Sequence, residues 1–486
     1  MRSLFSLQSL LVIGIIVLSI ASARSSSLMA DRYHAIEPLA NRDTRQNSQK
    51  KNTLKSTGSH QTLSVLDNTH TQLYPPASTL KILTALAAKA KLGDEFRYTT
   101  ALSASDSDWV LRFSGDPTLT REDLNRLLVT AKRLGHRKIN GDLWLDDSAF
   151  SGYDRAVGWP WDGLGVCYSA PASAISLDGN CAHAALYSQK NGQTRVNLPA
   201  HYPLKVITTT QTVSEKEQKA RHCGLELHSD NTNRYHLSGC MTSRDKPLPL
   251  KFAIQNSALY TKAVLKTLLK ANGIVLNGSI RIGQPSTNTA RQTIARHHSN
   301  PLPSLLKVML QESNNLIADN LTKSLGAAVY QTSGSFANGT AAIIEVLAQL
   351  GISLEGAQLV DGSGLSRNNR LSPQQMFAVL HYIANHDAQL QLITLLPSSG
   401  LDGTLKYRPS MRAEDITGRI KAKSGSLYGS YNMAGFGLNE TGTPHTAFVH
   451  FVRDFFPDKT LGQGYQMQDL TNIEQHFFRQ VIKQSQ

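Results

Sequence analysis

The chain is short of several features that would define a membrane or nucleic-acid-binding protein. Beyond its first 23 residues, no apolar run approaches the roughly 20 residues needed to cross a bilayer, so we expect no integral membrane segment in the mature chain. Only 7% of the 486 residues are aromatic, four are cysteines, and no internal repeat stands out. A chain of this length can still bury a substantial core in two or three domains.

Acidic residues are also scarce, at 36 against 50 basic ones, which gives a formal net charge of +14. One local basic run consists of Arg42, Arg45, Lys50, Lys51 and Lys55. No aromatic residue interleaves with it, so a nucleic-acid groove is not expected. The excess of positive charge fits either a solvated face or salt-dependent attraction to polyanionic cell-envelope material.

The N-terminus has the pattern of a secretory signal. Arg2 precedes an apolar stretch over 10–20, and Ala21-Ser22-Ala23 is a small-x-small cleavage site. The apolar stretch is too short for a permanent anchor, although an uncleaved anchor is the alternative. No cysteine near the cleavage site offers a lipid attachment point. We therefore predict a signal peptide over 1–23, with cleavage near Ala23 and export to the periplasm or cell envelope.

Export places the cysteines in an oxidising compartment, where disulfides persist. The simplest pairing joins neighbours in sequence, although four cysteines allow three connectivities. A zinc site is the alternative, but its ligand spacing fits no common zinc pattern. The expected disulfides are Cys167–Cys181 and Cys223–Cys240, and the zinc ligands would be Cys223, His228, His236 and Cys240.

Hydrophobic periodicity predicts a mixture of helices and strands. A polar, basic lead-in over 24–59 is expected to be poorly ordered, and 62–66 is a predicted strand. Predicted helices cover 79–92, about 120–135, 256–272, a stretch from Ser304 past Leu321, 341–350, 372–385 and the C-terminus. Gly93 is the expected stop of the first helix, and capping boxes are expected at Thr120 and Ser372. Predicted strands cover 97–102, 109–113, 416–422, 431–438 and 446–452, with a hairpin turn at 139–142 and a strand pair near Ile274 and Ile280.

The first candidate motif is Ser78-Thr79-Leu80-Lys81 at the start of a helix. Residues three apart share one helix face, so Lys81 can reach Ser78. A serine hydroxyl becomes a useful nucleophile when a base removes its proton, and lysine serves as that base when burial and positive neighbours lower its pKa. We therefore assign Ser78 as nucleophile and Lys81 as base, with Lys423 as the positive neighbour.

Two further motifs complete the candidate site. In Ser313-Asn314-Asn315, Ser313 would relay a proton between Lys81 and a leaving amine, and Asn315 would bind the substrate backbone. In Lys423-Ser424-Gly425-Ser426, Lys423 and the hydroxyls would hold a terminal carboxylate and Gly425 would permit close approach of a ligand. The Ser426 and Ser78 N–H groups would form an oxyanion hole. About 200 residues separate the first motif from the others, so one shared site requires a large insertion.

In order and type these motifs match those of active-site serine enzymes that act on D-alanyl peptides or β-lactams. The chain resembles the class C low-molecular-mass penicillin-binding proteins, which are D-alanyl-D-alanine carboxypeptidase/endopeptidases. Six further stretches match: Phe113 to Thr120, Gly158 to Trp161, Ala170 to Pro171, Asp361 to Ser366, Gly400 to Thr404, and Tyr431 to Phe436. The third motif departs from the usual Lys-Thr-Gly but keeps its hydroxyl at Ser424. At Gly163 the family tends to have an acidic residue, so the side-chain preference for the peptide is open.

The resemblance implies a transpeptidase/β-lactamase-like α/β (α+β) catalytic domain whose antiparallel sheet is flanked by helices. A strand-rich insertion of one or two domains over 96–296 would divide it into parts at 60–95 and 297–486. The expected function is hydrolysis of peptidoglycan stem peptides or cross-links, with acylation by β-lactam antibiotics and no metal or organic cofactor. The alternatives are a β-lactamase that uses the same motifs and a non-catalytic envelope-binding protein.

Overall fold

The computed structural model describes residues 31–39, 70–285, 290–456 and 463–486. The predicted signal peptide and the predicted strand at 62–66 lie outside these residues. None of the helices in the described part has the length and apolar character to cross a membrane.

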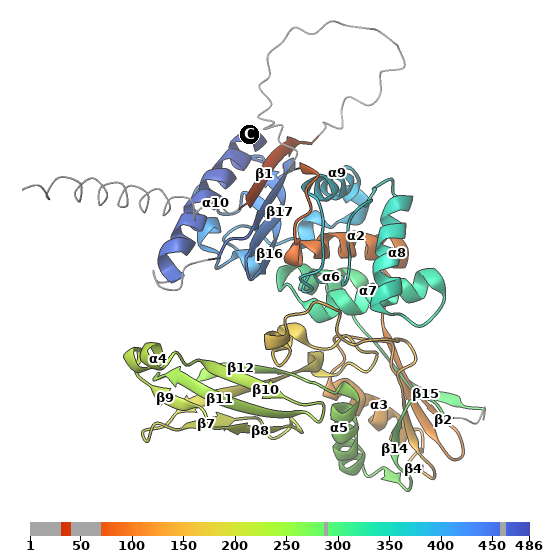
Figure 1. Cartoon of the computed structure of the whole chain (residues 1–486). Coiled ribbons are helices and arrows are strands. Elements are labelled where there is room, and N and C mark those ends of the chain that lie inside the picture. Colours follow the sequence, from red (N-terminus) through yellow and green to blue (C-terminus); the bar gives the residue numbers. More distant parts are fainter. Residues whose placement is uncertain (1–30, 40–69, 286–289, 457–462) are drawn as a thin grey trace, which may run out of the picture.

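A four-stranded antiparallel sheet, in the order β1-β18-β17-β16, forms the centre of the upper body in Figure 1. Successive side chains along its strands point to opposite faces of the sheet and thus into two different apolar clusters. Ala447 and Val449 of β18 pack with helix α2, whereas Phe448 packs with the C-terminal helix α10. The strands are β1 (Asp31–Pro38), β16 (Ile420–Leu427), β17 (Ser430–Leu438) and β18 (Pro444–Arg453).

Helices cover both faces of this sheet. Helix α10 lies on one face, and α2 and α9 belong to the group on the other. The predicted stop of α2 at Gly93 is confirmed, with a φ of 75°, and so is the capping box that starts α9 at Ser372. The helices are α2 (Lys81–Leu92), α6 (Leu302–Gln311), α7 (Asn315–Tyr330), α8 (Phe336–Gln349), α9 (Pro373–Leu390) and α10 (Gln463–Ser485).

Residues between Thr99 and His298 form the lower body in Figure 1, with an apolar cluster of their own. A five-stranded sheet, in the order β14-β5-β3-β2-β15, packs with helices α3 (Arg121–Arg133) and α5 (Ser257–Asn272). The predicted capping box at Thr120 is confirmed. The strands are β2 (Thr99–Ala104), β3 (Trp109–Arg112), β5 (Leu143–Asp146), β14 (Ile280–Ile282) and β15 (Gln292–His298), with β4 (Lys138–Ile139) and β13 (Val275–Leu276) paired separately.

A second part of the lower body is made of small sheets and carries both disulfides, Cys167–Cys181 and Cys223–Cys240. The second disulfide contradicts the alternative of a zinc site, because both cysteine ligands are oxidised. The elements are β6 (Cys181–Ser188), β7 (Thr194–Asn197), β8 (Lys205–Thr208), β9 (Gln211–Val213), α4 (Glu215–Arg221), β10 (Leu225–Ser229), β11 (Arg234–Thr242) and β12 (Leu248–Ala253).

Four predictions were wrong. The lead-in over 24–59 contains β1, which pairs with β18 along its whole length. The turn at 139–142 is not a hairpin, because β4 pairs in parallel with β13 and β5 pairs in parallel with β3 and β14. For the same reason the strands near Ile274 and Ile280 do not pair with each other. The helix predicted from Ser304 is two helices, α6 and α7, which are separated at 312–314.

Candidate active site

Ser78 lies in a 3-10 helix, η4 (Ala77–Leu80), that continues directly into α2. The preceding residue, Ala77, has a φ of 48°, a left-handed conformation that residues other than glycine rarely adopt. Two glycines let other segments approach this turn. A Cβ on Gly364 would lie 1.8 Å from the Ala77 carbonyl oxygen, and one on Gly425 would lie 2.9 Å from the Ser78 nitrogen. The Ser78 turn therefore packs closely between a loop at 361–366 and strand β16.

Lys81 is fully buried and points at Ser78. Its Nζ lies 3.0 Å from Ser78 Oγ and also contacts Asn315 Oδ1 and the Ser363 carbonyl oxygen, each at 2.6 Å. Burial lowers the pKa of Lys81 to about 8, although two nearby carboxylates, Asp319 and Asp361, oppose this effect. A substantial fraction of neutral amine is thus present near neutral pH, and a neutral amine in this position can accept the Ser78 proton.

The two carboxylates were not anticipated from the sequence. Asp319 follows Asn315 by one helical turn on α7, and its carboxylate accepts hydrogen bonds from the Gly362 and Ser363 N–H groups. Burial and the neighbouring Asp361 raise the pKa of Asp319 to about 8. Both residues are completely buried. The main cause of the lowered Lys81 pKa is therefore burial, and the two carboxylates, Asp319 and Asp361, act in the opposite direction.

Asp361 organises the loop that closes over Lys81. Its carboxylate accepts hydrogen bonds from the Gly364 N–H at 2.8 Å, from the Ser366 N–H at 2.6 Å and from the Trp159 indole N–H at 2.9 Å. Both the 361–366 loop and the Trp159 region belong to stretches that carry the family resemblance. That resemblance was the signal in the sequence from which Asp361 could have been assigned to the site.

Ser313 lies at the break between α6 and α7 rather than within a helix. Its φ is 57°, and the following Asn314 caps α7 by accepting a hydrogen bond from the Ile317 N–H at 3.0 Å. Ser313 Oγ accepts a hydrogen bond from Lys423 Nζ at 2.9 Å. Among the described residues, no hydrogen bond joins Ser313 to Lys81, so the structure has two separate serine–lysine pairs.

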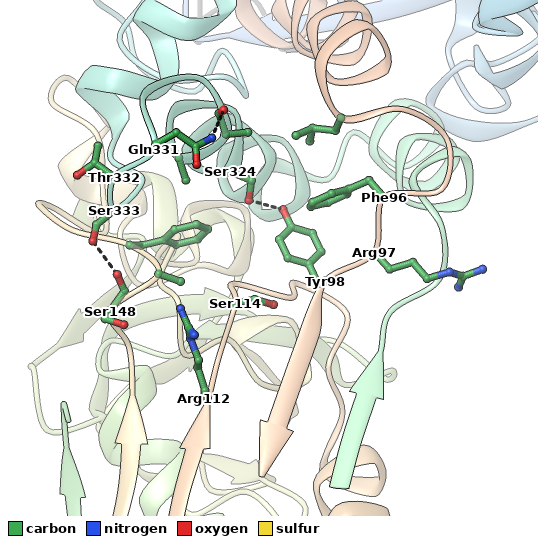
Figure 2. Close-up of a pocket in the computed structure, with 15 residues that line it drawn as sticks. Phe96, Arg97, Tyr98, Arg112, Ser114, Ser148, Ser324, Gln331, Thr332 and Ser333 are labelled. Atoms are coloured by element: carbon green, nitrogen blue, oxygen red, sulfur yellow. Dashed lines mark hydrogen bonds between the residues drawn. The ribbon is translucent and has the colours of Figure 1, made fainter. Parts of the chain in front are cut away.

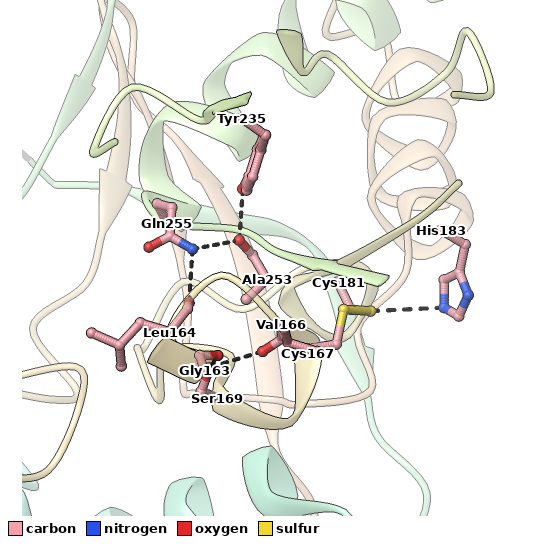
Figure 3. Close-up of a disulfide and its surroundings, with 10 residues drawn as sticks. All are labelled: Gly163, Leu164, Val166, Cys167, Ser169, Cys181, His183, Tyr235, Ala253 and Gln255. Carbon is pink, nitrogen blue, oxygen red and sulfur yellow. Dashed lines mark hydrogen bonds between the residues drawn. A yellow bond between two sulfur atoms is a disulfide. The ribbon is translucent and has the colours of Figure 1, made fainter. Parts of the chain in front are cut away.

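Asn315 links the site to the lower body. Its Oδ1 contacts Lys81, and its Nδ2 donates to the carbonyl oxygen of Tyr168 at 2.7 Å. Tyr168 lies in the short helix η6 (Cys167–Ser169), which the Cys167–Cys181 disulfide ties to the start of β6 (Figure 3). A segment of the lower body therefore completes the environment of Asn315.

The third motif lies within strand β16, not at its end. Lys423 is completely buried, and its Nζ donates to the Ser424 carbonyl oxygen at 2.7 Å. Burial, Lys81 and Arg408 together lower the pKa of Lys423 well below its usual range. Ser424 Oγ shares a hydrogen bond of 2.8 Å with Thr404 Oγ1, and Ser426 is exposed.

Gly425 and Gly163 both lie against neighbouring groups. The space at Gly425 is occupied by the backbone of the Ser78 turn, so here the glycine permits close packing within the protein. A Cβ on Gly163 would lie 1.8 Å from Tyr168 Oη, so the Tyr168 ring occupies the direction in which a side chain would project. The neighbouring Trp161 is 84% exposed.

The structure thus joins the first residues of α2, the α6–α7 break and strand β16 around Ser78, Lys81, Ser313, Asn315 and Lys423. This arrangement, on an antiparallel sheet flanked by helices, defines an active-site serine hydrolase with the penicillin-binding type of fold. Residues 45–470 match the model of the D-Ala-D-Ala carboxypeptidase 3 (S13) family, and the chain belongs to this family.

Comparisons with individual proteins agree. The chain is 39% identical over 389 residues to D-alanyl-D-alanine carboxypeptidase DacB of Haemophilus influenzae, covering 78% of this chain and 80% of that protein. It is 28% identical to a D-alanyl-D-alanine carboxypeptidase of Actinomadura sp., covering 74% and 70%. The crystal structure of penicillin binding protein 4 (dacB) from H. influenzae matches with a TM-score of 0.82 and 34% identity, covering 95% of this chain and 99% of that one. The predicted fold class and enzyme class are confirmed.

Proposed function

We propose that this protein is an exported serine DD-peptidase that removes terminal D-Ala from peptidoglycan stem peptides, or cleaves D-Ala-containing cross-links, through an acyl-enzyme on Ser78. The observation that carries the proposal is the Lys81–Ser78 pair. Its Nζ–Oγ distance is 3.0 Å, and the amine is buried with its pKa lowered to about 8.

In the acylation step, Ser78 Oγ attacks the carbonyl carbon of the penultimate D-Ala while its proton passes to Lys81. The C–N bond then breaks, and the proton held on Lys81 passes by way of the Ser313 hydroxyl to the leaving amine, which leaves Lys81 neutral again. Water subsequently attacks the ester, which releases the shortened peptide as a carboxylic acid and returns the proton to Ser78. The positions of Ser313 and Asn315 beside the two lysines support these roles.

Strand β16 would bind the substrate backbone. It is an edge strand, and the 397–399 segment covers the first part of that edge through hydrogen bonds to Ile420 and Ala422. Because main-chain groups alternate in direction along a strand, those of Ser424 and Ser426 face the same edge. Among the described strands, β16 pairs only with β17, so an extended peptide can add there as a further strand. The Ser426 N–H is then available, with that of Ser78, for the oxyanion.

Lys423 would bind the substrate carboxylate. In the free protein, burial together with Lys81 and Arg408 lowers its pKa. A bound carboxylate stabilises the charged ammonium, and the Ser424 hydroxyl supplies a second donor.

A penicillin reporter tests the nucleophile. We expect covalent label on the peptide that contains Ser78, and none on a folded Ser78→Ala variant. Label on another residue would contradict the assignment. The same experiment separates the alternatives: a long-lived adduct supports a DD-peptidase, rapid loss with turnover indicates a β-lactamase, and no adduct on either protein indicates a binding protein. Incubation with purified muropeptides, with products identified by mass, then measures carboxypeptidase against endopeptidase activity.

We also propose that the catalytic domain consists of 60–95 and 297–486 together with strand β1, which pairs with β18, and that 96–296 is inserted into it. Separate apolar clusters in the upper and lower bodies support this division. Export with cleavage near Ala23 completes the proposal, and mass analysis of the mature N-terminus would test it.

A further inference from the structure

A cavity of about 620 Å³ lies between the C-terminal half of α7, the segment that precedes β2 and the end of β3 (Figure 2). Its volume is within the range of small-molecule sites. Ala327 and Ala328 of α7 line one side, and Arg112 and Ser114 line another. Ala327 follows Asn315 by twelve residues on one helix, so the cavity is about 18 Å along α7 from the Ser78 site. The cavity is therefore a separate candidate binding site.

Aromatic rings with fixed positions form part of its wall. Phe96 packs edge-on against the buried Tyr98, with ring centroids 5.1 Å apart. Phe150 lies against Gly115, where a Cβ would come within 2.3 Å of the ring, and Lys323 Nζ lies 5.5 Å from its centroid. Such rings present flat apolar surfaces, which suit the C–H face of a sugar ring.

Hydroxyl groups surround these rings. Ser324 Oγ contacts Tyr98 Oη at 3.2 Å, and Ser333 Oγ donates to the Ser148 carbonyl oxygen at 2.7 Å, as Figure 2 shows. Ser114 and Thr332 add two further hydroxyls to the lining. Because a hydroxyl both donates and accepts, such a wall suits a ligand that itself carries hydroxyl and amide groups.

The cavity also has a positive group directed into it. Figure 2 shows the Arg112 guanidinium in the space between Ser148 and Ser114. Its Nε lies 3.8 Å from Asp146 Oδ2, and it has no closer partner among the described residues. Arg97, in contrast, points outward and donates to the Ser299 carbonyl oxygen. No acidic residue is among those described as lining the cavity. The terminal nitrogens of Arg112 are therefore placed to bind a carboxylate.

We propose that this cavity binds a carboxylated N-acetyl amino sugar, namely a muramic-type unit of the glycan whose lactyl carboxylate is free because its peptide has been removed. The sugar ring covers the aromatic wall, its hydroxyl and acetamido groups bond to the serine hydroxyls, and its carboxylate pairs with Arg112. The inference rests on the proposed function, because peptidoglycan is the polymer on which the proposed enzyme acts.

Two simple sugars test the proposal on the whole protein. N-acetylmuramic acid carries the lactyl carboxylate, and N-acetylglucosamine is the same sugar without it. Binding is measured by calorimetry or ligand-observed NMR on protein treated with penicillin and on Ser78→Ala. We expect N-acetylmuramic acid to bind both, with N-acetylglucosamine about tenfold weaker, as expected for one charge-assisted contact.

Arg112→Gln should weaken N-acetylmuramic acid binding about tenfold, and Arg112→Lys should retain part of it. Arg137→Gln removes the same charge from an exposed arginine outside the cavity and should change nothing. Absence of binding, equal affinity for both sugars, or equal effects of the Arg112 and Arg137 variants would overturn the proposal. Loss of binding after penicillin treatment would place the sugar at Ser78 and also refute it. Because binding is measured without catalysis, absence of peptidase activity leaves this test intact.

Discussion

Replacement of Lys81 and Lys423 by arginine separates the base from the carboxylate-binding lysine. With a pKa of about 8, roughly a tenth of Lys81 is neutral at pH 7. A lysine with its ordinary pKa would be neutral in about 3 of 10,000 molecules. Burial in this site therefore increases the amount of active base about 300-fold. Acylation of the native enzyme should rise with pH, reach half its maximum near pH 8 and level off above about pH 9.

An arginine at position 81 stays protonated throughout the accessible pH range and cannot take the Ser78 proton. We expect Lys81→Arg to slow acylation by about 10³-fold or more, with no recovery at high pH. Lys423→Arg keeps a positive charge where the substrate carboxylate would bind. Its acylation rate should therefore fall by less than about 10²-fold, and its pH profile should still level off.

The measurement is the rate of acylation by a reporter penicillin from pH 5 to pH 10. Lys421→Arg is the matched control, because Lys421 lies on the same strand with its Nζ directed to the Leu396 carbonyl oxygen. Its rate should resemble that of the native enzyme. Equal losses in the two active-site variants, or an active Lys81→Arg enzyme, would show that the roles are assigned wrongly.

Three further predictions concern charge, crosslinking and acid stability. Asp319→Asn removes a charge that raises the pKa of Lys81, so the acylation profile should rise at lower pH, whereas Asp319→Glu should leave it near its native position; no shift for either would exclude this coupling. Replacing Cys223 and Cys240 together by serine should lower the free energy of unfolding by about 3 kcal/mol in urea denaturation, and an unchanged midpoint would refute the estimate. Burial lowers the pKa of His450 to about 4, so stability is lost as the pH falls from about 6.5 towards 4, by up to about 3 kcal/mol. His450→Phe should lose less stability over that interval in urea denaturation at pH 7 and pH 4.5, and an equal loss would contradict the reasoning.

Local signals in the sequence predicted most helices and the three motifs. The capping pairs at Thr120 and Ser372 and the stop at Gly93 depend on neighbouring residues, so they can be recognised without tertiary information. The order of the motifs likewise indicated a shared site and a long insertion.

The remaining features depend on contacts between distant segments. Strand β1 is polar in sequence, and its pairing with β18 joins residues more than 400 positions apart. The α6–α7 break was hidden because apolar residues continue across it, and Asn314 reads as a helix cap only once Ser313 is seen in a left-handed conformation. The opposing effect of Asp319 and Asp361 on Lys81 arises from burial of all three groups together, which no spacing rule reveals.

The disulfide beside Tyr168 has a consequence for when the enzyme becomes competent. Asn315 contacts Lys81 with one end of its amide and the Tyr168 carbonyl with the other, and Tyr168 follows Cys167 directly. The final alignment of that amide thus depends on a bond that forms only under oxidising conditions. Under the export that we propose, a newly made chain in the reducing cytoplasm would lack this constraint and would gain it in the oxidising compartment where the cell wall lies. Oxidative folding would in this way delay the hydrolysis of peptidoglycan until the disulfide has formed.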